Sequence, residues 1–340
     1  MTNYVEIGKY LGVALSRYMI QVMIKKALLC TFCLFLLTVG CTSINSSNTE
    51  DTSNNQTSAL SESTTSSTNH RNELREQIQQ ISDAAQGRVG VTATVLETGE
   101  SVTLNGNQRF PMRSVYKFPI AMAVLAQVDQ GKLKLDHKIR VKTSDVVQGS
   151  QILDEKSQGM EFTLTELLKY MVSQSDNTAC DVLLRLVGGP KIVTQYLRGL
   201  GVNDIVVAST EKEQGQDTAV QYRNYATPDA AVVLLRAFHE GRELSKSSQA
   251  LLRRLMTETS TGSKRIKGLL PDGTVVAHKT GTSSTVNRVT AATNDVGLVT
   301  LPNGRHLAIA VFVSDSLANN AIREGVIAKV AKASWDKWSK

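Results

Sequence analysis

The chain contains little cysteine. Its 340 residues include four, and Cys30, Cys33 and Cys41 fall in an N-terminal segment with the pattern of an export signal. Cys180 is therefore alone in the rest of the chain, which excludes an internal disulfide. We expect Cys180 to be a buried, apolar packing residue beside the functional site.

Aromatic residues and charge of one sign are also scarce. Aromatic side chains make up 5% of the chain, and because residues 1–41 hold four basic residues and one acidic residue, the net charge of +7 leaves +4 for the remainder. Such mild basicity does not indicate a nucleic-acid partner. No group of His and Cys residues has the spacing of a metal-binding motif, and no glycine-rich phosphate loop follows a strand. We expect no metal and no cofactor.

Residues 23–41 have the pattern of an export signal. Two lysines follow Met23, an apolar run continues to Leu37, and small residues precede Cys41. This ending resembles a bacterial lipobox with Cys41 as the lipid-bearing residue, although Thr38 stands where an aliphatic residue is usual. We expect a periplasmic protein with a lipid anchor, and a soluble periplasmic protein is the alternative. The apolar run is short for a transmembrane span, and translation starts at the first methionine or at Met23.

The composition divides the chain into three parts. Residues 1–41 form the N-terminal extension and signal. Residues 42–70 are nearly all Ser, Thr and Asn, and because they cannot bury enough apolar surface to fold, we expect a flexible tether. Residues 71–340 have the length of a single domain with two lobes and a large core.

Strand patterns lie at both ends of this domain. Val89–Val95 alternates and turns into a second strand, and residues 295–300 and 306–313 flank a Pro-Asn-Gly turn. A long helix follows to Lys340, and the middle of the chain is helical. The order predicts an α/β fold of the two-lobed α+β type, with a sheet built from both termini and an inserted helical lobe.

The first of three short motifs pairs Ser114 with Lys117. Residues three apart share a helix face, so a helix that begins at Ser114 would bring the lysine to the hydroxyl and activate a poor nucleophile. Its free N–H groups would face developing negative charge. The apolar run Ala121–Ala126 predicts a buried helix as a rigid mount, with a local irregularity at Pro119. Alone, the pair is more typical of a helix cap and a solvated lysine.

The second motif, Ser175-Asp176-Asn177, lies between two predicted helices. Thr163 and Glu166 match the capping box of the helix before it, and an apolar helix over residues 179–187 follows. A short connection held by rigid helices can present a hydroxyl and an amide to a cleft. Alone, this motif is more typical of an ordinary N-cap.

The third motif follows a β-branched strand pattern at residues 274–278. On an edge strand, Lys279 and Thr280 could bind a carboxylate, and the backbone N–H of Thr282 could donate to an oxyanion. Gly281 would allow a ligand to approach the backbone closely. A Lys-Thr-Gly at the end of a strand is by itself most often a turn.

Together the three motifs resemble those of class A serine β-lactamases, and the similarity runs from Glu73 to the C-terminus. Three stretches, Ser175–Asp181, Gln221–Tyr225 and Thr290–Asp295, are similar to the PER-type branch, which acts on extended-spectrum cephalosporins. The resemblance implies the fold of serine β-lactamases and penicillin-binding transpeptidases, an antiparallel sheet flanked by helices with the site between two lobes. It also implies hydrolysis of penicillins and cephalosporins, which confers antibiotic resistance.

A β-lactamase needs a carboxylate that activates water on the acyl-enzyme, and the family places it between the second and third motifs. The candidates are Glu211, which keeps the register of the PER-type loop, and Glu213. The commoner loop has an Arg two residues before the glutamate and an Asn four residues after it, where this chain has Ser209 and Gly215. The anchoring of the loop and the second partner of the water are therefore open.

The resemblance also implies the residue roles. Ser114 attacks the lactam carbonyl, and its proton passes to Lys117 or, through water, to Glu211. Ser175 relays a proton to the leaving nitrogen, Glu211 activates water, and the backbone N–H groups of Ser114 and Thr282 form the oxyanion hole. The substrate-binding residues are Asn177 for the side-chain amide and Lys279, Thr280, Gly281 and Thr282 around the carboxylate.

Two rival functions stay open at this point. A penicillin-binding D-alanyl-D-alanine peptidase would share all three motifs, and a non-catalytic envelope lipoprotein that binds peptidoglycan could keep the fold. Arg288 could add positive charge beside Lys279 or be a surface arginine. We expect small-molecule β-lactams as ligands, no nucleic acid, and a monomer.

Overall fold

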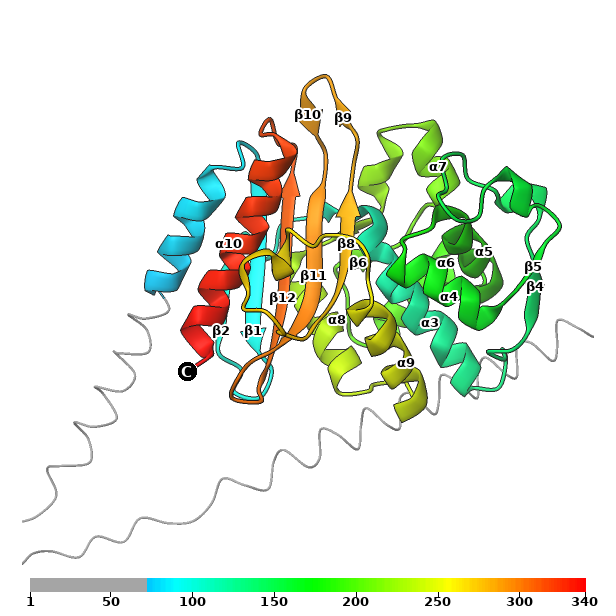
Figure 1. The fold of residues 1–340 in the computed structure, drawn as a ribbon, viewed down its shortest axis with the longest axis horizontal. Coiled ribbons are helices and arrows are strands. Elements are labelled where there is room, and N and C mark those ends of the chain that lie inside the picture. Colours follow the sequence, from blue (N-terminus) through cyan, green and yellow to red (C-terminus); the bar gives the residue numbers. More distant parts are fainter. Residues whose placement is uncertain (1–71) are drawn as a thin grey trace, which may run out of the picture. The chain divides into compact units, whose positions relative to one another are not determined.

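The computed structural model describes residues 72–340 (Figure 1). The predicted export signal, the lipid-bearing Cys41 and the tether lie outside these residues. Within residues 72–340, no helix combines the length and the apolar character needed to cross a bilayer.

A five-stranded antiparallel sheet forms from both ends of the described chain, as predicted. Its spatial order is β2-β1-β12-β11-β8, so the strand that carries the Lys-Thr-Gly motif is an edge strand. The two hairpins expected from the turn sequences, β1 with β2 and β11 with β12, are confirmed. The strands are β1 (Arg88–Val95), β2 (Ser101–Leu104), β8 (Val276–Thr282), β11 (Thr293–Thr300) and β12 (His306–Ser314).

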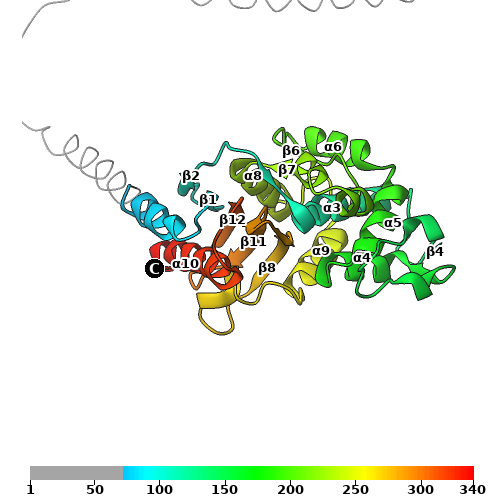
Figure 2. The same cartoon turned by 90° about the horizontal axis from the view of Figure 1, so that it is seen from above.

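Helices cover both faces of this sheet. Side chains of successive strand residues point to opposite faces, and β12 is apolar at almost every position because both faces are covered. Its odd-numbered residues from Leu307 to Val313 pack with α10 (Asn320–Trp338) and a helix over residues 72–83. Its even-numbered residues from Ala308 to Phe312 point to the other face, where they belong to a separate hydrophobic core that includes α8 (Pro228–His239). Figure 2 shows α10 and the N-terminal helix on one side of the sheet.

The inserted lobe is built around α3 (Lys117–Asp129). Every residue from Lys117 to Ala126 is buried, which confirms the predicted buried helix. Around it lie α4 (Leu164–Ser173), α5 (Asn177–Val187), α6 (Pro190–Gly199) and α9 (Lys246–Thr257). The predicted irregularity at Pro119 is wrong, because this proline is the third residue of α3, where its missing N–H costs no helical hydrogen bond.

Local caps set the ends of the lobe helices. The capping box of α4 is confirmed, with Thr163 and Glu166 bonding each other's backbone N–H groups. Asp176 caps α5, which ends at Gly188 with φ 106°, a value that favours glycine. The second motif therefore does lie where one helix ends and the next begins.

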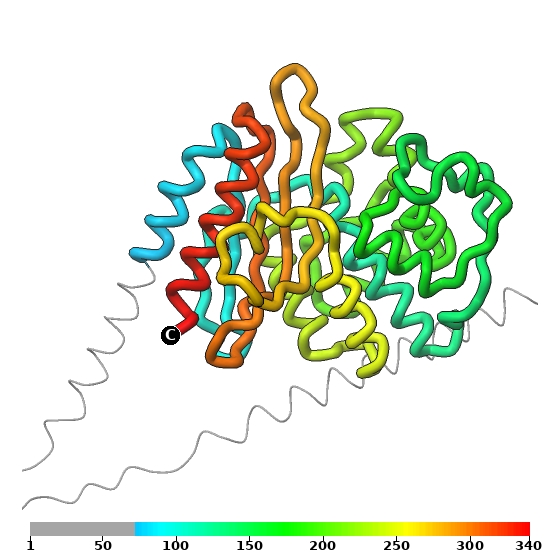
Figure 3. The backbone as a smooth tube through the Cα atoms, viewed as in Figure 1, coloured from blue at the N-terminus to red at the C-terminus, as the bar shows by residue number. Residues whose placement is uncertain are grey.

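Short elements complete the described chain, and the tube in Figure 3 shows the β9–β10 hairpin projecting past the sheet. The strands form pairs β4–β5 and β9–β10 and a three-stranded sheet β3-β7-β6. These elements are β3 (Phe110–Pro111), β4 (Lys138–Arg140), β5 (Glu161–Thr163), β6 (Ile205–Val206), β7 (Tyr225–Ala226), β9 (Thr285–Val286), β10 (Val289–Thr290), α7 (Glu211–Gln216) and the 3-10 turns η1 (Arg113–Tyr116), η2 (Thr143–Asp145), η3 (Glu155–Ser157), η4 (Val220–Arg223) and η5 (Ile266–Leu269).

Candidate active site

The three motifs meet at one cleft. Ser114 lies in η1, directly before α3, and is half-buried. A cleft of about 220 Å³ is lined by residues of all three motifs together with the 149–151 loop. Its lining includes Ser114, Ser150, Ser175, Asn177, Arg265, Thr280 and Thr282.

Lys117 is the centre of this site. Its side chain is fully buried, and Nζ donates hydrogen bonds of 2.6 Å to the Ser175 carbonyl and 2.6 Å to Asn177 Oδ1. Nζ also lies 3.1 Å from Glu211 Oε1, in an ion pair whose carboxylate is 3% exposed. One ammonium, on the first residue of α3, therefore contacts both the second motif and Glu211, the first residue of α7.

The two candidate glutamates differ in their surroundings. Glu213 is exposed, and its carboxylate accepts from the backbone N–H of Thr210 at 2.8 Å in the capping box of α7. Glu211 is buried and turned to Lys117. No hydrogen-bond donor of residues 72–340 serves Glu211 Oε1, because the contact with Lys117 is an ion pair without hydrogen-bond geometry. A buried carboxylate oxygen left in this way can accept a hydrogen bond from water.

Two buried residues fix the segment before and within α7. Asn224 Oδ1 accepts from the N–H groups of Ala208 and Ser209, and its Nδ2 donates to the Ser209 carbonyl at 2.9 Å. Asp181 accepts from the N–H groups of Glu211 and Lys212 at 2.8 and 3.0 Å. Burial raises the pKa of Asp181 to about 7, against the lowering effect of these two bonds. These contacts anchor the loop that lacks the commoner Arg and Asn.

Gly215 has open space around it, and the neighbouring Gln214 makes the contact to the nucleophile turn. Gln214 is buried, and its Oε1 accepts from Arg113 Nη1 at 3.0 Å. Arg113 precedes Ser114 and has φ 47°, a strained value for a residue with a side chain. The guanidinium also reaches the Thr282 carbonyl at 3.4 Å, so it links α7, η1 and β8.

Ser175 is held between two lysines. Its φ of 59° lies in the left-handed region, its carbonyl accepts from Lys117, and its Oγ accepts from Lys279 Nζ at 2.9 Å. Asp176 binds the same turn to the loop before η3, because its carboxylate accepts hydrogen bonds from the N–H groups of Ile152 and Leu153 at 3.0 and 3.1 Å. The second motif is thus fixed on both sides.

Lys279 is fully buried on β8. Burial lowers the pKa of its ammonium to about 7, the positive charge of Lys117 lowers it further, and Asp295 and Glu211 act in the opposite direction. This buried lysine is therefore close to the pH at which it loses its charge. A further anion beside it would favour the charged form.

Gly281 has a different neighbour from the one expected. A Cβ at this position would lie 2.2 Å from the Met112 carbonyl oxygen and 3.2 Å from the Val115 backbone nitrogen. The glycine therefore lets β8 approach η1, the turn that carries Ser114. We predicted that this glycine lets a ligand approach the backbone, but the close approach found here is between two parts of the protein, β8 and η1.

The sequence motifs missed one cationic side chain of the site. Arg265 is 5% exposed, and its Nη2 donates to Thr282 Oγ1 at 2.7 Å while Nη1 donates to the Asn294 carbonyl at 2.9 Å. Arg288, considered for this place, is exposed in the turn between β9 and β10. Arg265 stands in an ordinary basic stretch, so no local pattern distinguished it.

Cys180 is buried, as predicted, and its Sγ lies 3.3 Å from the Tyr116 hydroxyl. Burial raises the pKa of its thiol, and a thiol kept protonated is a poor nucleophile. Cys180 therefore packs beneath the site.

Residues 73–338 match the model of the beta-lactamase enzyme family. Over 250 residues, or 73% of this chain and 81% of the relative, the chain is 45% identical to the extended-spectrum β-lactamase PER-1 of Pseudomonas aeruginosa. It is 41% identical to β-lactamase VEB-1 of the same organism over 74% of this chain and 86% of that protein. Among solved structures, a β-lactamase from Chitinophaga pinensis is 48% identical with a TM-score of 0.76, covering 78% of this chain and 98% of that one.

The extended-spectrum β-lactamase TLA-3 has a TM-score of 0.77 at 44% identity, over 79% of this chain and 99% of its own. Residues 73–338 include all three motifs and α7, so the match takes in the whole candidate site. The chain belongs to the β-lactamase enzyme family, as a class A serine β-lactamase similar to the PER type.

Proposed function

We propose that this β-lactamase opens its substrates with Ser114 and releases the product with a water activated by Glu211. The observation that supports this most is the buried Glu211 carboxylate, 3.1 Å from the Lys117 ammonium, with Oε1 free of hydrogen-bond donors from the described residues. The enzyme hydrolyses β-lactam antibiotics and so confers resistance. Its relatives are β-lactamases, which favours this activity over the two rival functions, a peptidase and a non-catalytic lipoprotein.

In the acylation step, Ser114 attacks the lactam carbonyl. Its proton passes to Lys117 or, through water, to Glu211, and both routes end on the same ion pair. The backbone N–H groups of Ser114 and Thr282 donate hydrogen bonds to the negatively charged carbonyl oxygen. One such donor is typically worth on the order of a hundred- to a thousandfold in rate. Ser175 passes a proton to the leaving nitrogen. Its contact with Lys279 supports that role.

Substrate binding uses the other side of the cleft. Asn177 Oδ1 accepts a hydrogen bond from Lys117 Nζ. The NH₂ group of Asn177 is then left to donate to the carbonyl of the substrate's side-chain amide. Lys279, Thr280 and Thr282 bind the carboxylate, and Arg265, which is ion-paired with Glu324 at 3.1 Å, donates to Thr282 Oγ1 and fixes that side chain. The similarity to extended-spectrum enzymes supports cephalosporins as substrates beside penicillins.

In deacylation, Glu211 takes a proton from the water that attacks the acyl-enzyme. Replacing Glu211 with Gln keeps the shape but removes the base, so deacylation should slow by at least about a hundredfold, while acylation of Ser114 stays partly intact. Intact-protein mass spectrometry after mixing with benzylpenicillin should show a stable adduct of the whole antibiotic.

Glu213→Gln is the matched control, because glutamine can also close a capping box. Its turnover should stay within about threefold of the wild type, since Glu213 lies on the surface of α7. Wild-type turnover in Glu211→Gln, or an adduct that persists in Glu213→Gln, would overturn the assignment.

The buried position of Lys279 predicts a pH dependence. In the free enzyme its pKa of about 7 means that the ammonium loses its charge as the pH rises through that value, and a neutral amine binds a carboxylate poorly. The ratio kcat/KM, which reports the free enzyme, should therefore fall above about pH 7. A bound carboxylate restores the charge, so kcat should fall less.

Lys279→Arg separates this effect from other titrations, because a guanidinium stays charged. Its kcat/KM should remain level at pH values where that of the wild type declines. Steady-state kinetics with a cephalosporin from pH 6 to pH 9 make the comparison, and parallel profiles of the two enzymes would refute this role of Lys279.

We also propose that the enzyme is exported, lipid-anchored to the bacterial membrane through Cys41, and monomeric. The support is the basic, apolar and small-residue order before Cys41 and the Ser/Thr/Asn-rich residues after it. The wild type should fractionate with membranes and Cys41→Ser with the soluble periplasm. Equal release of both would leave the soluble periplasmic protein as the correct alternative.

A further inference from the structure

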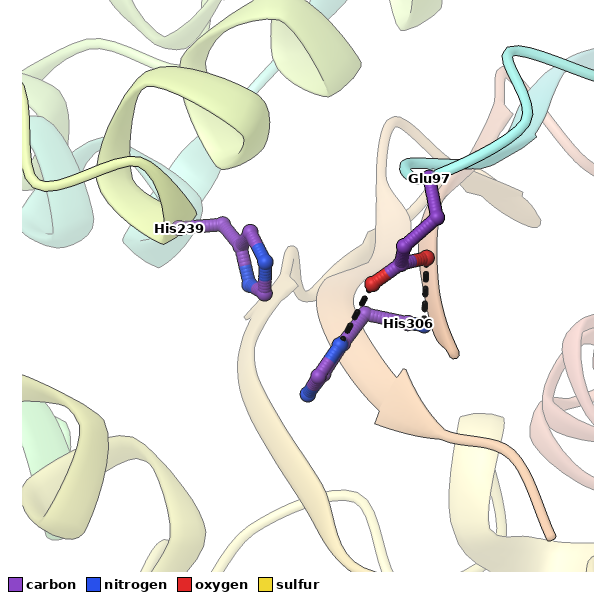
Figure 4. Close-up of side chains that lie close together, drawn as sticks. All are labelled: Glu97, His239 and His306. Atoms are coloured by element: carbon purple, nitrogen blue, oxygen red, sulfur yellow. Dashed lines mark hydrogen bonds and ion pairs between the residues drawn. The ribbon is translucent and has the colours of Figure 1, made fainter. Parts of the chain in front are cut away.

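Three potential metal ligands from separate parts of the chain meet at one end of the main sheet (Figure 4). Glu97 stands in the turn between β1 and β2, His306 is the first residue of β12, and His239 is the last residue of α8. One ligand atom from each residue lies within 4.8 Å of the other two. Their wide sequence separation gives no motif, which is why the spacing of His and Cys residues indicated no metal.

Two of the three side chains are already fixed in place. Glu97 Oε2 accepts from the His306 backbone N–H at 2.8 Å, and Glu97 Oε1 lies 2.8 Å from His306 Nδ1. The backbone N–H of Leu96 donates to the His306 carbonyl at 2.8 Å, which ties the turn to β12. The carboxylate is thus oriented before any ion binds.

The third side chain faces this pair. The ring centroids of His239 and His306 are 4.4 Å apart, with 51° between the ring planes. His239 Nδ1 lies 3.4 Å from Arg253 Nη2, and one nitrogen of the His239 ring lies within 4.8 Å of ligand atoms of both Glu97 and His306. The two rings and the carboxylate come together from different elements, as Figure 4 shows.

We infer that Glu97, His239 and His306 form a binding site for a divalent transition-metal ion, with Zn²⁺ as the best match. Two imidazoles and one carboxylate are a ligand set that zinc prefers, with water in the fourth position. Bonds of about 2.0–2.1 Å in a tetrahedron place ligand atoms about 3.3 Å apart. The Glu97–His306 pair would open slightly and the His239 ring would move inward. Glu97 is 38% exposed and His306 27% exposed, so an ion and a water can enter.

The site is remote from the cleft and independent of the proposed roles there. His306 pairs with Thr300, whereas Val313, at the other end of β12, pairs with Thr293, which in turn pairs with Thr282 of the cleft. At about 3.3 Å per residue, the seven steps along the strand from His306 to Val313 span roughly 23 Å. A bound ion would join the β1–β2 turn, the start of β12 and the end of α8, and so act as a stabilising clip.

The test uses the chain without a histidine tag, freed of metal by a chelator, and Zn²⁺ as the probe. Isothermal titration should show one site, and a hundredfold excess of Zn²⁺ over its Kd should raise Tm by about 5 °C. Co²⁺ should give the visible absorption of a tetrahedral nitrogen and oxygen site. His239→Gln should weaken Zn²⁺ binding at least tenfold, without changing the metal-free Tm.

His137→Gln is the matched control, because His137 is exposed in another part of the described chain. It should bind Zn²⁺ like the wild type. Arg253→Gln should bind Zn²⁺ more tightly, because it removes a positive charge beside His239. Equal affinity in the wild type and His239→Gln, or no binding by the wild type at 100 µM Zn²⁺, would overturn the inference.

Discussion

The organisation of the catalytic cleft depends on one buried positive charge, the ammonium of Lys117. A lysine without solvent is stable as a cation only when anions and carbonyl dipoles surround it. Lys117 is surrounded by the Ser175 carbonyl, the Asn177 amide oxygen and the Glu211 carboxylate. These groups come from two segments that are distant from α3 in the sequence. The charge to which we assign a role in acylation therefore also binds the α4–α5 turn and α7 at the start of α3, next to Ser114.

A second buried lysine, Lys279, lies on the opposite side of Ser175. Lys279 contacts Ser175 Oγ, while Lys117 contacts its carbonyl. Because burial disfavours its charged form and the charge of Lys117 adds to this effect, Lys279 has a pKa near 7 in the free enzyme. In the proposed role of Lys279, a substrate carboxylate adds to the negative charges of Asp295 and Glu211, which already favour the charged form. Part of the binding energy then comes from a charge that burial disfavours in the empty cleft.

The two lobes supply these groups from rigid elements. α3 is buried along most of its length and fixes η1 at its N-terminal end, and β8 is held by its ladder with β11. Gly281 lets the two meet without a side chain between them. The helix α7, which carries Glu211, is short, but buried side chains hold the backbone at its start. Asn224 binds the N–H of Ser209 and Asp181 binds the N–H of Glu211. Positions in the cleft are therefore set mostly by buried contacts.

Local signals in the sequence were sufficient for the main strands at both ends of the domain and for several of its helices. The capping box at Thr163, the alternation in β1 and the turn between β11 and β12 each act within a few residues, and the structure has the elements they predicted. The motifs also predicted which segments meet at Ser114. Pro119 was misjudged because the exact first residue of α3 decides whether a proline costs a hydrogen bond.

Long-range partners could not be predicted in this way. Arg265 reaches Thr282 across 17 positions and Asn224 binds Ser209 across 15, and their own neighbours in sequence carry no pattern for these bonds. The same holds for the Glu97, His239 and His306 group, which only the packing of α8 against the sheet brings together. The choice between Glu211 and Glu213 likewise depended on family register, and burial now separates them.

The most direct test of the central claim is a double-mutant cycle on the free energy of unfolding, using Lys117→Met, Glu211→Gln and the double variant. Removing one member of a buried ion pair leaves the other without compensation, whereas removing both does not. The two substitutions should therefore be non-additive, with a coupling of about 1–3 kcal/mol. Additive effects, within about 0.5 kcal/mol, would contradict the view that this buried charge holds the segments of the cleft together.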